Sequence, residues 1–225
     1  MASKPLRKQS HYKQSAAGTR ASATDLQRRR ILGAALHAFA STGYLGTKIS
    51  DIAAEAGVSH GLVHHYYGSK ILLYSTILEA GLSYLEESRR RALAGKHSLE
   101  EQQRRWIYSV IHCFDHKDTV LFGRLVMQIL GAPDVHPPAC VEALNRFTKL
   151  EIQILCSLLV DAGKSLEEAT AQSCLVFNTI LGNKLIGMHQ DAFNILFRTG
   201  CDLLGVSDQP LPDPIDYPSF PWTLE

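Results

Sequence analysis

The stretch Ile49–Lys70, ISDIAAEAGVSHGLVHHYYGSK, decides the fold. It contains two short amphipathic segments on either side of the turn Ala56–Ser59. Gly57 gives the backbone the freedom for a sharp reversal, and Val58 can fill the angle between the two helices. Ser59 is a favourable cap for the second helix, because its hydroxyl can accept a hydrogen bond from the first turn. The pattern therefore predicts a helix-turn-helix.

A third helix is expected before this motif and completes a small core. It is predicted to start at Thr24, which forms a capping box with Gln27, and to stop at Gly43. Thr47 is predicted to cap the next helix. Apolar side chains from the three helices can then face one another. The expected core and turn residues are Ile31, Phe39, Ile52, Ala53, Gly57, Val58, Val63 and Tyr67.

Burial of that core leaves His60, Gly61, His64 and His65 on the outer side of the last short helix. A short helix with an exposed N-terminus can enter the major groove of DNA, with its first turn on base edges and its dipole toward phosphate. The charge distribution agrees with this. Residues 1–95 carry thirteen Lys or Arg against six Asp or Glu, whereas the remaining residues carry ten against sixteen. Such a division indicates that only the N-terminal part meets a polyanion.

The rest of the chain is helical by its periodicity, and no segment shows a convincing period of two. The fold class is therefore all-α, with an N-terminal three-helix helix-turn-helix domain followed by a larger helical domain. Further helices are predicted over residues 70–93, 99–115, 119–131, 138–163, 166–188 and 191–205. The expected parts are a disordered basic arm (1–23), a helix-turn-helix DNA-binding domain (24–70), a larger helical domain (71–207), and a Pro-rich C-terminal tail (208–225).

Composition excludes several classes of protein. The longest apolar runs are too short for a membrane-spanning helix, and no apolar stretch follows the first basic residues as a secretory signal requires. The five cysteines are odd in number and contain no CxxC pair, which favours reduced thiols in the cytoplasm over a disulfide framework. We expect a cytoplasmic, nucleoid-associated protein with no membrane partner, no cofactor and no metal.

Residues 28–73, RRRILGAALHAFASTGYLGTKISDIAAEAGVSHGLVHHYYGSKILL, resemble the tetracycline-repressor (TetR) family of bacterial regulators. The match covers about one fifth of the chain and is specific. It includes an Ile-x-x-Ala-Ala-x-x-x-Phe first helix, Gly43-Tyr44, Thr47, Ile52-Ala53, Ala56-Gly57-Val58-Ser59, an aromatic pair, and Lys70 after a short break.

The resemblance implies a set of contacts with double-stranded DNA. Contacts with base edges or the groove are implied for His60, Gly61 and His64. Two positions depart from the family: Leu62 stands where a hydroxyl residue is usual, and His64 stands where Tyr is usual. Leu62 can instead touch a thymine methyl group. Phosphate contacts are implied for Thr47, Ser50, His65, Tyr66 and Lys70.

The resemblance also implies that the larger domain encloses an effector cavity. The helices over residues 99–131 and 141–188 carry more apolar surface than one layer of helices needs. The resemblance further implies that residues 71–207 form an effector-binding and dimerisation domain, and that binding of an unknown small-molecule effector releases DNA. The candidate residues for the cavity wall are Trp106, Phe122, Leu125, Phe147 and Phe177.

The last two helices are expected to form a homodimer, because their small residues allow close approach in a two-fold four-helix bundle. Two recognition helices set roughly 34–36 Å apart would read the halves of a palindromic operator. The chain is thus interpreted as a repressor and not as an enzyme. The candidate interface residues are Leu181, Leu185, Phe193, Phe197 and Leu204.

Three alternatives are weighed against this interpretation. Gly57–Gly61 matches the G-x-S-x-G elbow of hydrolases, but that elbow needs a strand before Ser59, and a helix is expected there. His60 and His64 have the spacing of a zinc site without its glutamate or a third ligand. A regulator that acts through a partner or through thiol redox chemistry would use the cysteines of the larger domain, which are Cys113, Cys140, Cys156, Cys174 and Cys201.

Overall fold

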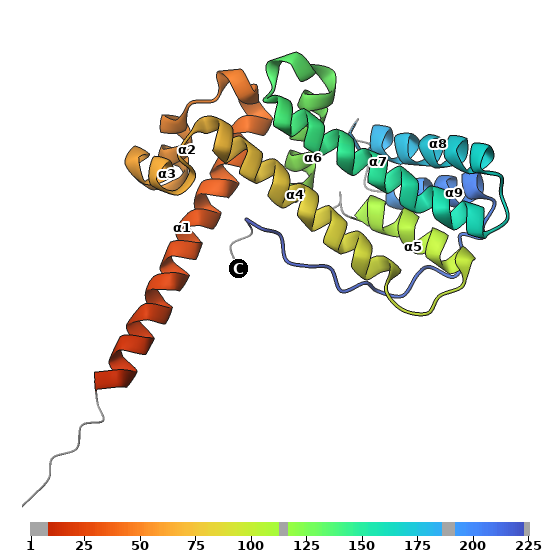
Figure 1. The fold of residues 1–225 in the computed structure, drawn as a ribbon, viewed down its shortest axis with the longest axis horizontal. Coiled ribbons are helices and arrows are strands. Elements are labelled where there is room, and N and C mark those ends of the chain that lie inside the picture. The colour runs from red at the N-terminus through yellow and green to blue at the C-terminus, as the bar shows by residue number, and fades with distance from the viewer. Residues whose placement is uncertain (1–8, 113–116, 186–191, 223–225) are drawn as a thin grey trace, which may run out of the picture.

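The computed structural model describes residues 9–112, 117–185 and 192–222, and the regular elements within these residues are all helices, with no strand (Figure 1). The all-α prediction, with three N-terminal helices ahead of a larger helical domain, is confirmed. The helices are α1 (Gln9–Gly46), α2 (Ile49–Ala56), α3 (His60–Tyr67), α4 (Lys70–Leu93), α5 (Leu99–His112), α6 (Lys117–Gly131), the short 3-10 helix η1 (Pro133–Val135), α7 (Pro138–Asp161), α8 (Leu166–Leu185) and α9 (Ala192–Leu204).

Helix α1 is longer than the sequence predicts. The structure continues it back to Gln9, so the expected helix start at Thr24 and its partner Gln27 lie inside the helix. The expected disordered arm over residues 1–23 is helical wherever the structure describes it, and residues 1–8 lie outside the description. The segment from Gln9 to Thr24 holds four alanines and no proline, so nothing interrupts a helix there. In Figure 1 this part of α1 projects from the body as a rod.

The end of α1 sets the position of the next helix. Gly43 adopts φ 75° and ψ 169°, which breaks the helical path as predicted. The predicted cap at Thr47 is wrong, because Lys48 occupies the N-cap position of α2 and makes no side-chain capping bond. The Thr47 hydroxyl instead donates to the carbonyl oxygen of Gly43 at 2.7 Å and lies 2.8 Å from the hydroxyl of Thr42. Its side chain therefore stabilises the bend between the helices.

Buried side chains form two separate cores. The first joins α1, α2 and α3 to α4, α6 and the start of α7, with Phe39 and Tyr74 in edge-to-face contact at a centroid distance of 4.9 Å. The second joins α5, α8 and α9 to the C-terminal half of α7 around Trp106. The helix-turn-helix therefore shares its core with part of the larger domain.

Residues 205–222, called the tail below, leave α9 and run back past α5 and α4 to α1 as an extended segment (Figure 1). Five prolines between Pro210 and Pro221 remove backbone donors and prevent a helix. Near its end, Phe220 and Trp222 are buried in the first core. The tail thus connects the far end of the larger domain to the helix-turn-helix.

Candidate nucleic-acid interface

The turn between α2 and α3 has the geometry that the sequence predicts. Gly57 lies in the left-handed region at φ 66°, which a side chain would strain. The amide of Val58 donates to the carbonyl of Ala53 at 3.0 Å and closes α2. Val58 itself is half-buried against the first core. These features place α3 across α2 in a fixed orientation.

Ser59 caps α3, because its hydroxyl oxygen accepts a hydrogen bond from the amide of Leu62 at 3.2 Å. The residues before Ser59 form helix α2, whereas the hydrolase elbow requires a strand there. The G-x-S-x-G match is therefore a helix cap and not a nucleophile elbow.

The inner side of the motif holds the predicted core. Ile52, Ala53 and Val63 are buried, and Tyr67 packs against them half-buried. The Tyr67 hydroxyl donates to the carbonyl of Arg28 at 3.1 Å, and burial raises the pKa of this phenol to about 12. This contact joins α3 to α1 and holds the third helix in place.

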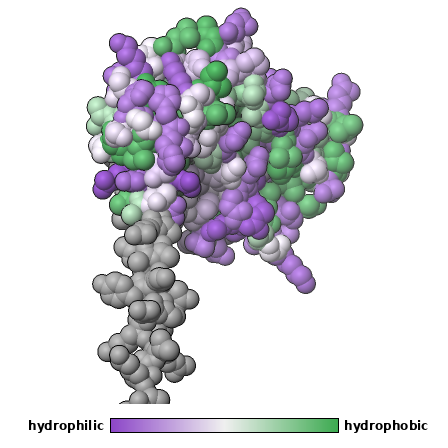
Figure 2. Space-filling model, turned by 60° about the vertical axis from the view of Figure 1, so that its left-hand side comes forward, coloured by the Kyte–Doolittle hydropathy of each residue, from purple (hydrophilic) through white to green (hydrophobic). Residues whose placement is uncertain are grey.

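The outer side of α3 presents the three residues expected to contact bases. His60, Gly61 and His64 are all exposed, and the two imidazole rings lie 4.6 Å apart. A side chain at Gly61 would meet no atom within 4 Å, so the backbone here is open to a ligand surface. Figure 2 turns this end of the molecule forward and shows hydrophilic residues interspersed with apolar ones.

The imidazole of His64 is oriented by the end of its own helix. Its Nδ1 lies 2.8 Å from the carbonyl oxygen of Gly68, and a carbonyl only accepts, so Nδ1 carries the proton. In a neutral ring Nε2 is then left as an acceptor. This arrangement can read a donor on a base edge.

The residues expected to contact phosphate fall into two groups. Ser50 and His65 are exposed, and the Ser50 hydroxyl donates to Asp51 at 3.1 Å. Thr47 is only 4% exposed, so the structure does not bring it to the surface. Its hydroxyl instead contacts Gly43 and Thr42 at the bend between α1 and α2.

Tyr66 and Lys70 already have partners within the chain. The Tyr66 hydroxyl donates to the side-chain oxygen of Gln27 at 3.0 Å. The Lys70 ammonium donates to the carbonyl of Leu45 at 3.2 Å and lies 4.8 Å from the centroid of the Tyr44 ring. Partial burial lowers the pKa of Lys70 from its usual value. This cation is thus held beside the bend that precedes α2.

Two basic residues on the same surface were not singled out from the sequence. Lys48 is exposed directly before α2, and the Arg28 guanidinium lies over the Tyr66 ring at 5.3 Å from its centroid. Lys48 could have been found from the sequence, because it is a basic residue directly before the first short helix of the motif.

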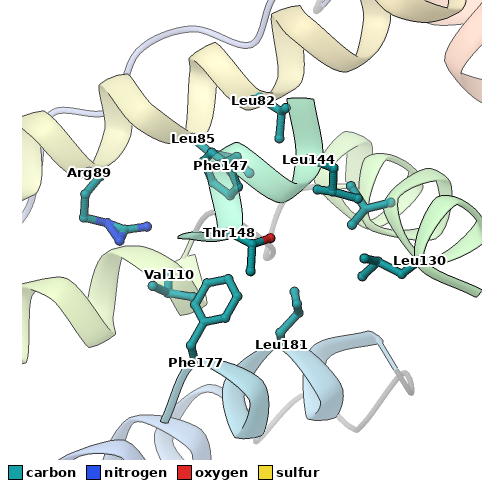
Figure 3. Close-up of a pocket in the computed structure, with 11 residues that line it drawn as sticks. Leu82, Leu85, Arg89, Val110, Leu130, Leu144, Phe147, Thr148, Phe177 and Leu181 are labelled. Carbon is teal, nitrogen blue, oxygen red and sulfur yellow. The ribbon is translucent and has the colours of Figure 1, made fainter. Parts of the chain in front are cut away.

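A cavity in the larger domain lies between α4, α5, α6, α7 and α8 (Figure 3). Of the predicted wall residues, Phe147 and Phe177 line it. Trp106, Phe122 and Leu125 are instead fully buried in the two cores and do not line it. The cavity volume is about 30 Å³, which is space for a water molecule or two and not for a drug-sized ligand.

Phe122 does not line the cavity because its ring packs against Gly81 of α4. A Cβ built on Gly81 would lie 2.2 Å from Cε2 of Phe122, so the ring rests directly on the backbone of α4. This contact brings α4 and α6 close together.

The predicted dimer contacts lie mostly inside one chain. Phe197 and Leu204 are buried in the second core, and Leu181 is half-buried and lines the cavity. Phe193 packs on Tyr108 at a centroid distance of 5.1 Å. The side chain of Leu185 lies outside the description. The exposed apolar side chains on these helices are different ones, since Leu175 on α8 is 53% exposed and Ile195 on α9 is 61% exposed.

The cysteines bear on the thiol alternative. Cys140 and Cys201 are buried, and burial raises the pKa of Cys201 to about 12 and also raises that of Cys140. Cys156 and Cys174 are half-buried, and Cys113 lies outside the described residues. A thiol held in its protonated form is a poor nucleophile, so the two buried cysteines are unsuited to a redox switch.

We expect Cys140 and Cys201 to react with iodoacetamide at least about 100-fold more slowly in the folded protein than after unfolding. Mass spectrometry of peptides from timed reactions would give both rates. Labelling of Cys201 at the rate seen in urea would contradict the assignment and restore the thiol-switch interpretation.

None of the helices that the structure describes is long and apolar enough to cross a membrane. Within the same residues, no group of three His, Cys, Asp or Glu side chains is placed to hold a metal ion.

Comparison with known proteins identifies the N-terminal part of the chain. The sequence model of the family of bacterial regulatory proteins called tetR matches residues 31–75. The HTH-type transcriptional regulator BetI of Agrobacterium fabrum is 46% identical over 69 residues, which cover 31% of this chain and 32% of that protein. The chain therefore spans about a third of the length of this curated relative.

Solved structures extend the likeness in fold to most of the chain. A TetR-like transcriptional regulator from Rhodococcus sp. RHA1 has a TM-score of 0.63 at 20% identity, covering 79% of this chain and 91% of that one. A transcriptional regulator from Saccharomonospora viridis, solved in complex with choline, has a TM-score of 0.66 at 19% identity, covering 79% and 95%. These proteins are regulators and not enzymes. Residues 31–75 therefore match the tetR family of bacterial regulatory proteins, and the described residues share the all-helical fold of solved TetR-like regulators.

Proposed function

We propose that the protein is a transcriptional regulator that binds DNA by placing α3 in the major groove. The observation that carries the proposal is the capped helix α3, fixed on a buried core with His60, Gly61 and His64 turned outward. The excess of basic residues over acidic ones in residues 1–95 also favours binding of DNA by the N-terminal part of the chain. DNA binding is assigned to residues 24–70, and effector binding and dimerisation to residues 71–207. Because its target is chromosomal DNA, a bacterial regulator of this kind acts in the cytoplasm.

The regulator acts as a homodimer, because one helix of eight residues offers too few base contacts for a specific site. Two copies related by a two-fold axis would read a palindromic operator. The exposed apolar side chains Leu175 and Ile195 on α8 and α9 replace the buried residues of our first interface prediction.

The protein is a repressor that an effector releases from DNA. The cavity between α4 and α8 is too small for a ligand as it stands, so a ligand must favour a state in which the cavity is wider. Helix α4 begins directly after α3 and borders the cavity through Leu82 and Leu85. A displacement of α4 would therefore change the spacing of the two recognition helices. One structural neighbour holds choline, so a quaternary ammonium is one class of effector to test.

The test of function is selection of bound fragments from a random pool of duplex DNA by the purified protein at moderate salt. Enrichment of a palindrome is the expected result and would supply the operator for ligand screening. A folded, dimeric protein that enriches no sequence would contradict the proposal and favour a regulator that needs a ligand or a partner protein.

Lys70→Met is expected to weaken the salt dependence of operator binding. Each phosphate contact contributes about 0.9 to the slope of log K against log salt, so the loss of one contact in each of two subunits lowers the slope by about 2. Binding measured by fluorescence anisotropy at several salt concentrations gives the slope. Lys96→Met, at an exposed residue beyond the far end of α4, is the matched control and should leave the slope unchanged. Equal slopes for Lys70→Met and the unmodified protein would remove Lys70 from the interface.

A further inference from the structure

The cavity between α4 and α8 has one charged group in an otherwise apolar wall. Leucine, valine and phenylalanine side chains form most of its lining, and the exceptions are Arg89 on α4 and Thr148 on α7. In Figure 3, Arg89 lies at one end of the cavity and Leu130 at the other, with Thr148 between them. The lining therefore has its charged group at one end and apolar side chains at the other.

The charge of Arg89 is already matched inside the protein. Its Nη1 donates to Glu151 of α7, and its Nε donates to the Ser109 hydroxyl at 2.8 Å. The side chains of Arg89 and Glu151 are 5% and 1% exposed. The guanidinium carbon also lies 5.0 Å from the centroid of the Trp106 ring. The pair is thus neutral as a unit, and the face of the aromatic ring next to it is occupied.

This arrangement disfavours both signs of charge on a ligand. A carboxylate at Arg89 would place a second negative charge beside Glu151, with one cation for both. A quaternary ammonium at this end of the cavity would lie beside the Arg89 guanidinium, another cation, which already occupies the face of the Trp106 ring. A buried charge without a partner is costly, so either ligand would bind poorly.

One set of donors remains for an uncharged ligand. Arg89 has five N–H groups, and its Nη2 makes no hydrogen bond to the residues that the structure describes. Because Arg89 lines the cavity, these donors can meet an acceptor that enters it.

We propose that the effector is an uncharged, largely apolar molecule with a hydrogen-bond acceptor, such as an ester or ketone carbonyl, that meets Arg89. The inference rests on the proposed function, in which this cavity is the effector site. The apolar body lies along the leucine and phenylalanine side chains toward Leu130, and the cavity widens to hold it.

Three probes with the same chain and different head groups test the charge rule: methyl octanoate, octanoate and octyltrimethylammonium. Binding to the purified full-length protein is measured by calorimetry below the aggregation concentration of each probe, without DNA. Methyl octanoate is expected to bind at least ten-fold more tightly than either charged probe. Tighter binding of octanoate or octyltrimethylammonium, or no binding of any probe, would overturn the proposal.

Two variants on α8 locate the binding. Leu181→Trp fills the cavity and is expected to abolish binding of methyl octanoate, whereas Leu166→Trp, at an exposed position at the start of the same helix, should retain it. Equal binding by both variants would place the probe elsewhere and overturn the assignment. Because no DNA is present, failure here is separate from failure of the selection experiment.

A second inference concerns the tail and rests on different contacts. Arg104 of α5 donates to the carbonyl of Gln209 at 3.0 Å, and Arg91 of α4 donates to that of Asp216 at 3.0 Å. The Phe220 ring lies 4.0 Å, centroid to centroid, from Tyr84 of α4. The tail is thus fixed to the larger domain along its length.

The end of the tail reaches the helix-turn-helix. Trp222 is 4% exposed and borders a surface groove formed by α1 and α2. Its carbonyl oxygen would lie 3.8 Å from a Cβ at Gly33 of α1. We infer that the tail is a strap that holds the DNA-binding helices in a fixed orientation on the larger domain.

Cutting the tail in the folded protein tests this inference without a folding defect. A protease recognition sequence is inserted between Asp213 and Pro214, which are both exposed, and hydrogen exchange is compared before and after cleavage. Exchange of amides in α1 and α2 is expected to rise at least ten-fold, while that in α8 stays unchanged. Unchanged exchange in α1 and α2 after release of the cut segment would overturn the inference. This readout does not depend on DNA binding.

Discussion

Glu151→Ala is expected to lower the free energy of unfolding by about 3–5 kcal/mol, because it leaves the Arg89 guanidinium buried without its anion. Arg89 lies on α4 and Glu151 on α7, and both side chains are almost fully excluded from solvent. The second carboxylate oxygen of Glu151 already has no hydrogen-bond partner among the described residues, so few polar groups nearby could replace the lost partner of Arg89. Urea unfolding followed by circular dichroism, at one fixed protein concentration, measures the change.

Two further variants separate the charge from the packing. Glu142→Ala, on the same helix, breaks an exposed pair with Arg146 and should cost at most about 1 kcal/mol. Arg89→Met combined with Glu151→Leu replaces the pair with apolar side chains and should recover most of the stability lost in Glu151→Ala. A loss of less than about 1 kcal/mol for Glu151→Ala would show that water reaches Arg89, which contradicts its burial.

His64→Ala is expected to weaken binding to the selected operator by about 1–3 kcal/mol in each half-site. A homodimer carries the substitution twice, so the total is about 2–6 kcal/mol, or roughly 30-fold to more than 10,000-fold in affinity. The physical reason is the imidazole orientation, since the bond from Nδ1 to Gly68 leaves Nε2 free to meet a base edge. Titration of labelled operator at constant salt and pH measures the effect.

The decisive comparison for His64 is between the operator and unrelated DNA. The substitution should reduce affinity for the operator and leave binding to unrelated duplexes nearly unchanged, because base contacts and not phosphate contacts are lost. His97→Ala, in the loop after α4, is the control and should change neither. Equal losses on both kinds of DNA would mean that His64 contacts the backbone.

Local signals in the sequence were sufficient to predict the helix-turn-helix. The left-handed glycine at position 57 and the Ser59 cap depend on neighbours within a few residues, so their roles follow from the motif itself. Thr47 shows the limit of such reasoning. Its hydroxyl suits a cap, but packing turned it toward Gly43 and Thr42 at the end of the preceding helix. The predicted start of α1 was also wrong. A capping box marks where a helix can begin, but here no helix-breaking residue precedes it, so the helix extends further toward the N-terminus.

The larger domain could be predicted only as a set of helices. Its helices are apolar on more than one side, so periodicity does not reveal which side faces the cavity, the core or a second subunit. Phe197 and Leu204 appeared suited to an interface and are buried, whereas Ile195 on the same helix is exposed. The position of Phe122 depends on Gly81, a residue on another helix that only the folded chain brings beside it.

The first core has a consequence for chimeric regulators. Val63 and Phe39 of the DNA-binding helices share that core with Phe122 of α6 and with Trp222 near the end of the chain. A chimera joined at residue 70 would therefore cut through one continuous set of packed side chains. Exchange of DNA specificity between relatives should instead graft only the outward residues of α3. The buried residues beneath them, together with α6 and the end of the tail, should stay with their own chain.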